Sequence, residues 1–368
     1  MRVAWISRDW GLRQRFDGSE IKTPGGSGYH RCILPAQGLS EFGGIETGCF
    51  ADATVRPSGE IVPLDDNRWI MPGDWDIVVL QRWMQPEIAE ITSRARAAGQ
   101  IVIQDVDDHF WALHRANAAF YVTDPSHNES WNREHYAEAL RAASLVTVST
   151  PFLAEVIKTE LGQPNVTVLS NMIDLANWHR QPVRREVKTI GWVGVTSHRS
   201  QDLEQMGSAI RYFLRDHKDV TFIHGGHHVD NPQVAKILGI PKSRTQARPM
   251  MPIEHYPRLW QGIDTALCPL NPIDFNVAKS ALKGMEASAA GVPFVASPLP
   301  EYERYGQGRF ATTPEQWSDN LDDLMDYGVR QDLADRAHER VQAEDVGMRW
   351  ADWLVAYQTV VDSALTRA

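Results

Sequence analysis

Short apolar runs alternate with longer amphipathic stretches along the first half of the chain. The runs that predict strands are Arg2–Ile6, Gly48–Ala51, Ile77–Leu80, Ile101–Ile103, Leu145–Val148 and Thr167–Leu169. The stretches that predict helices are Tyr29–Phe42, Pro86–Ala98, Asn132–Ala143 and Pro151–Leu161. Thr150 and Pro151 are suited to the N-cap and first position of the last of these helices. Such alternation is typical of a parallel sheet covered by helices.

The same order restarts after the polar stretch Asp174–Val187, which we interpret as a linker. Strands are predicted at Thr189–Val193, Val220–His224, Thr265–Pro269 and Pro293–Ala296, and helices at Asp202–Asp216, His255–Gln261 and Ala278–Ala290. The chain therefore predicts two doubly wound α/β domains, residues 1–180 and 181–346, that face each other across a cleft. Ligands of such sheets bind at the carboxyl ends of the strands. A last amphipathic helix, Gly347–Arg367, needs a partner surface, which we expect on the first domain.

Composition agrees with a globular protein of this size. The chain has 368 residues, of which 43% are apolar and 23% charged, enough for two cores. A net charge of −10 disfavours non-specific nucleic-acid binding. Three cysteines without a CxxC pair favour a reducing compartment, and the N-terminus enters a strand without a long apolar stretch. We expect a cytoplasmic location.

The most informative segment is NPIDFNVAKSALKGMEASAAGVPFVASP, residues 271–298, which predicts a loop, a helix, a tight turn and a buried strand. Lys279, Ser280 and Lys283 lie at the front of the helix, where free backbone N–H groups and the helix dipole bind phosphate. Glu286 follows Lys283 near the same face and can accept hydrogen bonds from ribose hydroxyls. The alternative is a surface helix on which Lys283 and Glu286 form a solvated ion pair. Gly291 suits a left-handed position just after the helix.

This segment resembles the donor-binding segment of the retaining family-4 glycosyltransferases (glycosyl transferases group 1), which have the GT-B fold. GMEASAAGVPFVAS matches the second half of their Glu-x7-Glu pattern, with Glu286 at the second Glu. The first Glu falls at Ala278, so Asp274 or Asn276 would replace it in holding the donor sugar. The resemblance implies a nucleoside-diphosphate sugar donor, with UDP- or GDP-sugars favoured, no strict need for a metal, and transfer with retention.

Four loops support this interpretation. The strand Thr189–Val193 leads into a small-residue loop with Gly194 and Arg199, which could hold the diphosphate, and a second strand ends at Gly225. Met251 lies where similar enzymes cover the base, and Gly26 belongs to a glycine-rich loop that would face the phosphates. Ordinary turns and surface loops are the alternatives. The nearby His224, His227 and His228 lack the spacing of a zinc site.

The stretch IVIQDVDDHFW delivers Asp105, Asp107 and Asp108 to the carboxyl end of a strand. Three neighbouring carboxylates should raise the pKa of at least one, unless a cation lies nearby. One of them could orient the acceptor hydroxyl, act as a base or stabilise the transition state. Asp-x-Asp could instead bind a metal, as in single-domain GT-A enzymes, and helix capping is a third role. The GT-A class would not explain the segment at residues 271–298. We favour the first role, because GT-B enzymes generally use lysines, arginines and helix dipoles where GT-A enzymes use a metal.

We therefore expect a glycosyltransferase whose acceptor is a saccharide, a lipid-linked molecule, a protein or a modified nucleic-acid base. The candidate catalytic residues are Asp105, Asp107, Asp108 and Lys279. The candidate donor-binding residues are Gly26, Gly194, Arg199, Gly225, Met251, Asn276, Ser280, Lys283 and Glu286. Two alternatives are a nucleotide-sugar epimerase of the same fold and a non-catalytic protein that binds a nucleotide or sugar.

Overall fold

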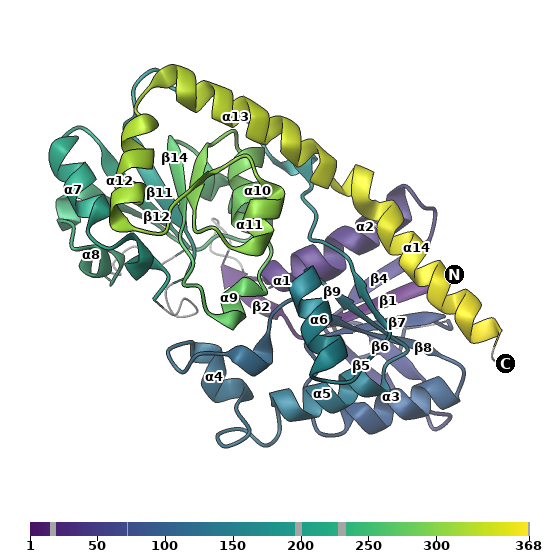
Figure 1. Ribbon diagram of the computed structural model, residues 1–368. Helices are drawn as coiled ribbons and strands as arrows, with labels where there is room; N and C mark the ends of the chain where they lie inside the picture. Colours follow the sequence, from purple (N-terminus) through teal and green to yellow (C-terminus); the bar gives the residue numbers. More distant parts are fainter. Residues whose placement is uncertain (15–19, 72, 196–200, 227–232, 367–368) are drawn as a thin grey trace.

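The chain folds into two α/β domains, each built on its own six-stranded parallel sheet (Figure 1). The computed structural model describes residues 1–14, 20–71, 73–195, 201–226 and 233–366. The expected two-domain architecture is confirmed, and the segment between residues 174 and 187 separates the last strand of one sheet from the first strand of the other.

The first sheet reverses its strand order beside β1. Across the sheet the strands are β10 (Val166–Val168), β9 (Leu145–Val148), β8 (Ile101–Val106), β7 (Ile77–Gln81), β1 (Arg2–Ser7) and β4 (Glu46–Phe50). From β1 the chain crosses to β4 on one side and then returns to β7 on the other. A crevice opens at the carboxyl ends where the order reverses, and this is where such sheets bind ligands.

Helices cover both faces of this sheet, and the first domain also contains two separate hairpins. The helices are α1 (Gly26–Gly28), a π-helix (Tyr29–Ile33), α2 (Leu34–Glu41), α3 (Ile88–Ala97), α4 (Ala118–Thr123), α5 (Arg133–Ala142) and α6 (Pro151–Thr159). The hairpins pair β2 (Trp10–Gln14) with β3 (Glu20–Pro24) and β5 (Asp52–Val55) with β6 (Ile61–Leu64). The apolar pattern predicted the six sheet strands but neither hairpin.

The second sheet has the same kind of switch, beside β11. Its strands are β13 (Thr245–Arg248), β12 (Thr221–Gly225), β11 (Thr189–Val193), β14 (Thr265–Cys268), β15 (Phe294–Ala296) and β16 (Arg309–Phe310). Its helices are α7 (Ala209–Asp216), α8 (Gln233–Leu238), α9 (Asp274–Val277), α10 (Leu282–Ala289), α11 (Pro300–Tyr305), α12 (Pro314–Asp323) and α13 (Tyr327–Val341). The edge strands β13 and β16 were not predicted, because they are short and only partly buried.

The C-terminal helix returns to the first domain, as expected. α13 runs along the second domain, and α14 (Val346–Leu365) then crosses to the first, where the C-terminus lies (Figure 1). Trp353 and Tyr357 of α14 are buried in the core that contains Trp5 of β1. No helix in the described parts of the chain is both long and apolar enough to cross a membrane.

The predicted helix ends at Thr150 and Gly291 are confirmed, but two predicted helices are not continuous α-helices. Thr150 caps α6 through the N–H of Leu153, and Gly291 follows α10 with φ of +73°. The expected helix 202–216 is broken at Gly207 into a 3-10 turn and α7, and the expected helix 29–42 begins with the π-helix. The spacing of apolar residues predicts a helix of either kind, so it does not show where an α-helix gives way to a 3-10 turn or a π-helix.

Candidate active site

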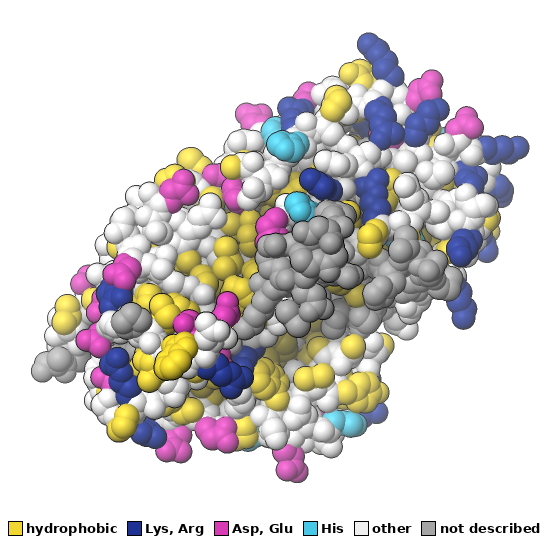
Figure 2. All heavy atoms as spheres, turned by 180° about the vertical axis from the view of Figure 1, so that it is seen from behind, with side chains coloured by type: hydrophobic (Ala, Val, Ile, Leu, Met, Phe, Trp, Pro, Cys, Tyr) yellow, Lys and Arg dark blue, Asp and Glu magenta, His cyan; other side chains and the backbone are white. Residues whose placement is uncertain are grey.

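The two domains enclose a cleft with a cavity of about 500 Å³, into which the carboxyl ends of both sheets open. Hydrophobic side chains gather in the hollow between the two halves of the molecule (Figure 2). The residues that give the cleft its polar chemistry are Asp9, His30, Arg82, Asp107 and Asp108 from the first domain, and Lys279, Ser280, Lys283 and Glu286 from the second.

The first-domain polar groups follow directly after buried strands. Asp9 lies just beyond β1, Arg82 directly follows β7, and Asp107 and Asp108 follow β8. Because neighbouring parallel strands end at one edge, these side chains meet although they lie far apart in sequence. Arg82 has φ of +59°, a left-handed conformation that costs a non-glycine residue energy and recurs at functional sites.

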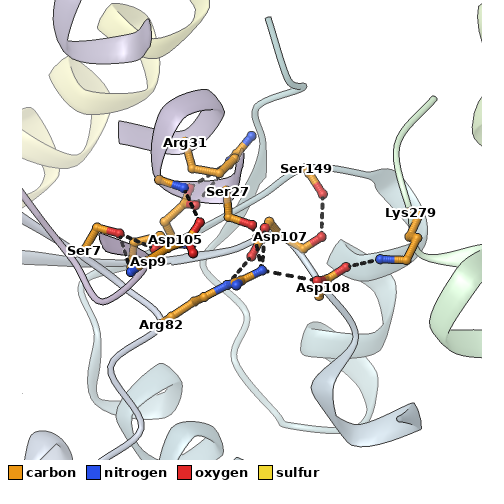
Figure 3. A network of polar contacts seen from close by, with 12 residues as sticks. Ser7, Asp9, Ser27, Arg31, Arg82, Asp105, Asp107, Asp108, Ser149 and Lys279 are labelled. Atoms are coloured by element: carbon orange, nitrogen blue, oxygen red, sulfur yellow. Dashed lines mark hydrogen bonds and ion pairs between the residues drawn. The ribbon is translucent and has the colours of Figure 1, made fainter. Parts of the chain in front are cut away.

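Arg82 holds the two carboxylates Asp107 and Asp108 together (Figure 3). Its guanidinium donates to Asp107 at 3.2 and 3.0 Å, to Asp108 at 3.2 Å and to Ser27 Oγ at 2.6 Å. Burial raises the pKa of Asp107, and the Asp108 carboxylate adds to this rise while Arg82 opposes it. The expected raised pKa in this cluster is therefore present, on Asp107.

The prediction of Asp105 as a catalytic residue is corrected, because the structure places its side chain away from the cleft. Its side chain is fully buried within β8, and both carboxylate oxygens accept hydrogen bonds from Arg31, at 3.0 and 2.7 Å. Thr147 Oγ1 donates a third bond at 2.6 Å. Asp105 and Asp107 therefore have different partners, which also argues against an Asp-x-Asp metal site. Asp105 is a structural residue that anchors the π-helix to the sheet.

The glycine-rich loop is held in place by Asp9. The Asp9 carboxylate accepts from the N–H of Gly28 at 2.9 Å, and its carbonyl accepts from Gly25 at 2.7 Å. A Cβ at Gly25 would lie 2.4 Å from the Asp9 carboxylate, so a side chain here would displace the group that holds the loop. A Cβ at Gly26 would meet nothing within 4 Å, and Gly26 lines the cleft. The exposed backbone of Gly26 is thus open to a ligand.

The predicted phosphate-binding helix is shorter than expected. α10 begins at Leu282 rather than Ala278, so Lys279 and Ser280 lie in the turn that precedes it. The carbonyl of Ala278, which a longer helix would use internally, accepts from Thr150 Oγ1 of the first domain at 2.8 Å. Ser280 Oγ accepts from Asn171 at 2.8 Å, and Lys279 Nζ lies 2.6 Å from Asp108 (Figure 3). Lys279 and Ser280 therefore reach the cleft from the turn, where three contacts tie the domains together.

Glu286 is buried in the cleft wall, which rules out the surface ion pair considered above. Glu286 is 2% exposed. Its carboxylate lies 2.9 Å from Lys283 Nζ and accepts a hydrogen bond from the hydroxyl of Tyr256 at 3.0 Å. Lys283 also donates to that hydroxyl. A buried charge needs such partners. The Glu286 carboxylate is therefore held in a fixed orientation next to Lys283, which lies in the first turn of α10.

The remaining donor candidates differ in where they lie. Met251 and Gly194 line the cleft, but a Cβ at Gly194 would lie 2.6 Å from the Trp192 ring, so this glycine is also required by packing. Gly225 is buried at the end of β12 and does not line the cleft, whereas its neighbour Gly226 does. This corrects Gly225 as a direct ligand contact. Arg199 lies outside the described residues, as do His227 and His228.

Asn276 is a third correction. It is 2% exposed, and its amide donates to Asp202 at 2.7 Å and to the carbonyl of Asn271 at 2.9 Å. Because it does not line the cleft, it cannot replace the missing Glu as a direct contact. It instead fixes the loop before α9.

Sequence reasoning missed four residues that shape the cleft: His30, Arg82, Asn171 and Tyr256. Arg82 could have been found, because it directly follows a strongly predicted strand. His30 is a polar residue on the buried side of a predicted helix, which is a weaker signal. Asn171 lies in an irregular segment and Tyr256 in a 3-10 helix, Ile253–Trp260, and neither carried a signal of its own.

Comparisons with known proteins support the fold. No protein-family model and no curated protein matches the chain. Sucrose-phosphate synthase from Thermosynechococcus elongatus is 12% identical, with a TM-score of 0.64 over 98% of this chain and 99% of its own. A Listeria monocytogenes protein assigned as a UDP-N-acetylglucosamine 2-epimerase is 15% identical, with a TM-score of 0.55 over 98% and 97%.

TarM is similar over a smaller share of its length. It is 11% identical, with a TM-score of 0.57 over 83% of this chain, which spans 63% of the length of TarM. A variant of S. aureus TarM has been solved in complex with UDP. Such low identities establish the fold alone. With two facing parallel-sheet domains and a returning C-terminal helix, the chain has the GT-B fold.

Proposed function

We propose that this chain is a glycosyltransferase that takes its sugar from a nucleoside diphosphate bound in the cleft. The observation that carries the proposal is the buried Glu286 of α10, held by Lys283 in the first turn of the same helix and by Tyr256. A carboxylate with a fixed orientation suits the paired hydroxyls of a ribose. The adjacent lysine and helix N-terminus suit the attached diphosphate. UDP is the favoured nucleotide, since the similarly folded TarM variant holds UDP.

The proposed chemistry is stabilisation of the leaving diphosphate. When the bond between the sugar and the diphosphate breaks, the phosphate oxygen takes both electrons and negative charge develops on it. Lys279, Lys283 and the N–H groups at the start of α10 are the groups that would oppose this charge. Lys279 is bound to Asp108 across the cleft, so the donor phosphate would share or replace that ion pair.

Asp107 and Asp108 are the proposed acceptor-side groups. They belong to the first domain, face the cleft and are held by Arg82. The raised pKa of Asp107 brings it closer to the range in which a carboxyl group exchanges a proton with an acceptor hydroxyl. The resemblance of the 271–298 segment to retaining enzymes supports transfer with retention. The anomeric configuration of the product tests this.

A second candidate is an epimerase that acts on its own nucleotide-sugar. The observation that favours it is the full-length fold similarity to the protein assigned as a UDP-N-acetylglucosamine 2-epimerase. The two functions differ in one measurable respect. An epimerase converts a UDP-sugar without an acceptor and without releasing the sugar, whereas a transferase leaves the donor sugar unchanged until it is transferred or hydrolysed.

The test of the donor site is a thermal-shift panel with UDP, GDP, ADP, dTDP and their sugar conjugates. A ligand at a hundred times its Kd should stabilise the protein by about 2.7 kcal/mol. We expect a selective shift with one nucleotide, and its loss in Glu286→Gln. Glu301→Gln is the matched control, because Glu301 is also buried and paired three residues along a helix, with Arg304, but lies outside the cleft. If no nucleotide shifts the well-folded protein, or if both variants behave alike, the donor site is wrong.

A further inference from the structure

His30 lies on the floor of the cleft, on the π-helix that follows the glycine-rich loop. The residue is 6% exposed. π-Helical turns are rare and are frequent at functional sites. Here the turn carries His30, which lines the cleft, next to Arg31, which points into the first-domain core and is bound to Asp105. The sheet therefore fixes the segment that presents His30.

The hydrogen bond at Nδ1 of His30 defines which ring nitrogen carries the proton. Nδ1 lies 3.0 Å from the carbonyl oxygen of Met172. A carbonyl only accepts, so in the neutral ring Nδ1 carries the hydrogen and Nε2 carries a lone pair. Within the described residues, Nε2 has no hydrogen-bond partner, and the ring borders the cavity. The cleft thus contains a nearly buried acceptor atom without a protein donor.

The charge state of the ring agrees with this assignment. Burial lowers the pKa of His30, and Lys283 and Arg31 act in the same direction. Glu286 and the bond to Met172 oppose this. Lys283 and Glu286 belong to α10 of the other domain, so the imidazole faces the proposed donor site. At neutral pH the ring is uncharged.

The chemistry of the facing groups limits what Nε2 can bind. Phosphate oxygens are acceptors, and a lone pair beside the Glu286 carboxylate does not bind another acceptor. A hydroxyl group can donate to it. We propose that Nε2 of His30 accepts a hydrogen bond from a hydroxyl of the nucleotide-sugar donor, and so selects a donor bearing that hydroxyl. This inference rests on the proposed function and adds a first-domain contact to the donor site.

Two hydroxyl sources fit, the ribose and the transferred sugar, and they can be separated by titration. His30→Asn places an amide N–H where Nδ1 stands, which keeps the bond to Met172, but leaves no acceptor at the Nε2 position. His30→Gln places an amide oxygen near Nε2 and loses the bond to Met172. A purely structural histidine is thus best replaced by Asn, and a ligand-binding one by Gln.

Calorimetric titration of the full chain with UDP and UDP-glucose provides the test. We expect His30→Asn to weaken binding by about tenfold, the effect of one lost hydrogen bond in a buried site, and His30→Gln to stay within about threefold of the wild type. Weakening for both ligands identifies the ribose, and weakening for UDP-glucose alone identifies the sugar. If His30→Asn binds both ligands as tightly as the wild type, the inference is overturned.

The pH dependence gives an independent readout. Protonation of Nε2 removes its lone pair, so wild-type affinity for UDP-glucose should fall as the pH is lowered, and because the pKa of His30 is lowered the fall should begin below the range of an ordinary imidazole. His30→Gln lacks this titration and should lose the acid limb. An acid limb that is identical in both proteins would contradict the inference. Failure of the proposed function has a different signature, in which the wild type itself binds neither UDP nor UDP-glucose, and the inference then fails with it.

Discussion

Replacing Arg31 by methionine should lower the free energy of unfolding by about 3–5 kcal/mol, because it leaves the Asp105 carboxylate buried without its cation. Arg31 and Asp105 are both 0% exposed. The guanidinium also donates to the carbonyl of Leu169 and to Asn171, and lies 4.8 Å from the ring of Trp353 on α14. One side chain thus connects the π-helix, the sheet and the C-terminal helix.

Denaturant unfolding of Arg31→Met measures this loss, with two comparisons. Arg336→Met breaks the exposed pair with Asp332 and should change stability little. The double variant Arg31→Met with Asp105→Leu should recover part of the loss, since removing both charges avoids the unpaired carboxylate. If Arg31→Met is as stable as Arg336→Met, the buried pair does not hold the first domain together.

Replacing Lys279 by methionine should slow release of UDP from the donor by about 10²–10³-fold, the range found when one group that stabilises developing negative charge is removed. UDP affinity should fall much less, because Lys283 and Glu286 remain. Lys279 contacts Asp108 of the other domain, which is one of the two proposed acceptor-side carboxylates.

Initial rates of UDP release from the UDP-sugar that shifts the melting temperature provide the measurement. Lys242→Met, on an exposed 3-10 turn outside the cleft, is the control for loss of one positive charge. Melting curves of Lys279→Met exclude a folding defect. Equal rates in the wild type and Lys279→Met would remove Lys279 from the proposed catalytic groups.

What the sequence predicted well depends on local chemistry. The strand Thr189–Val193, the cap at Thr150 and the left-handed Gly291 each follow from a few adjacent residues, and all three are confirmed. The two-domain fold followed from repetition of the same local pattern. These features need no knowledge of what the chain folds against.

What the sequence could not predict depends on long-range pairing. Asp105 and Asp107 look equivalent in IVIQDVDD, yet Asp105 forms an ion pair with Arg31 and Asp107 forms one with Arg82. α10 starts at Leu282, and the carbonyl of Ala278 before it accepts from a hydroxyl 128 residues away. Such contacts join residues far apart in the sequence, so neither the pairing of the carboxylates nor the partner of the Ala278 carbonyl can be seen in the local pattern.

The most direct test of the proposed donor site is a crystal structure of the chain with UDP bound. The account predicts the nucleotide in the interdomain cleft, with ribose hydroxyls on the Glu286 carboxylate and the diphosphate against Lys283 and the backbone N–H groups that begin α10. A ribose hydroxyl hydrogen-bonded to Nε2 of His30 would also support the proposed role of this histidine in donor selection. UDP bound outside this cleft, or a cleft that stays empty at saturating UDP, would contradict it.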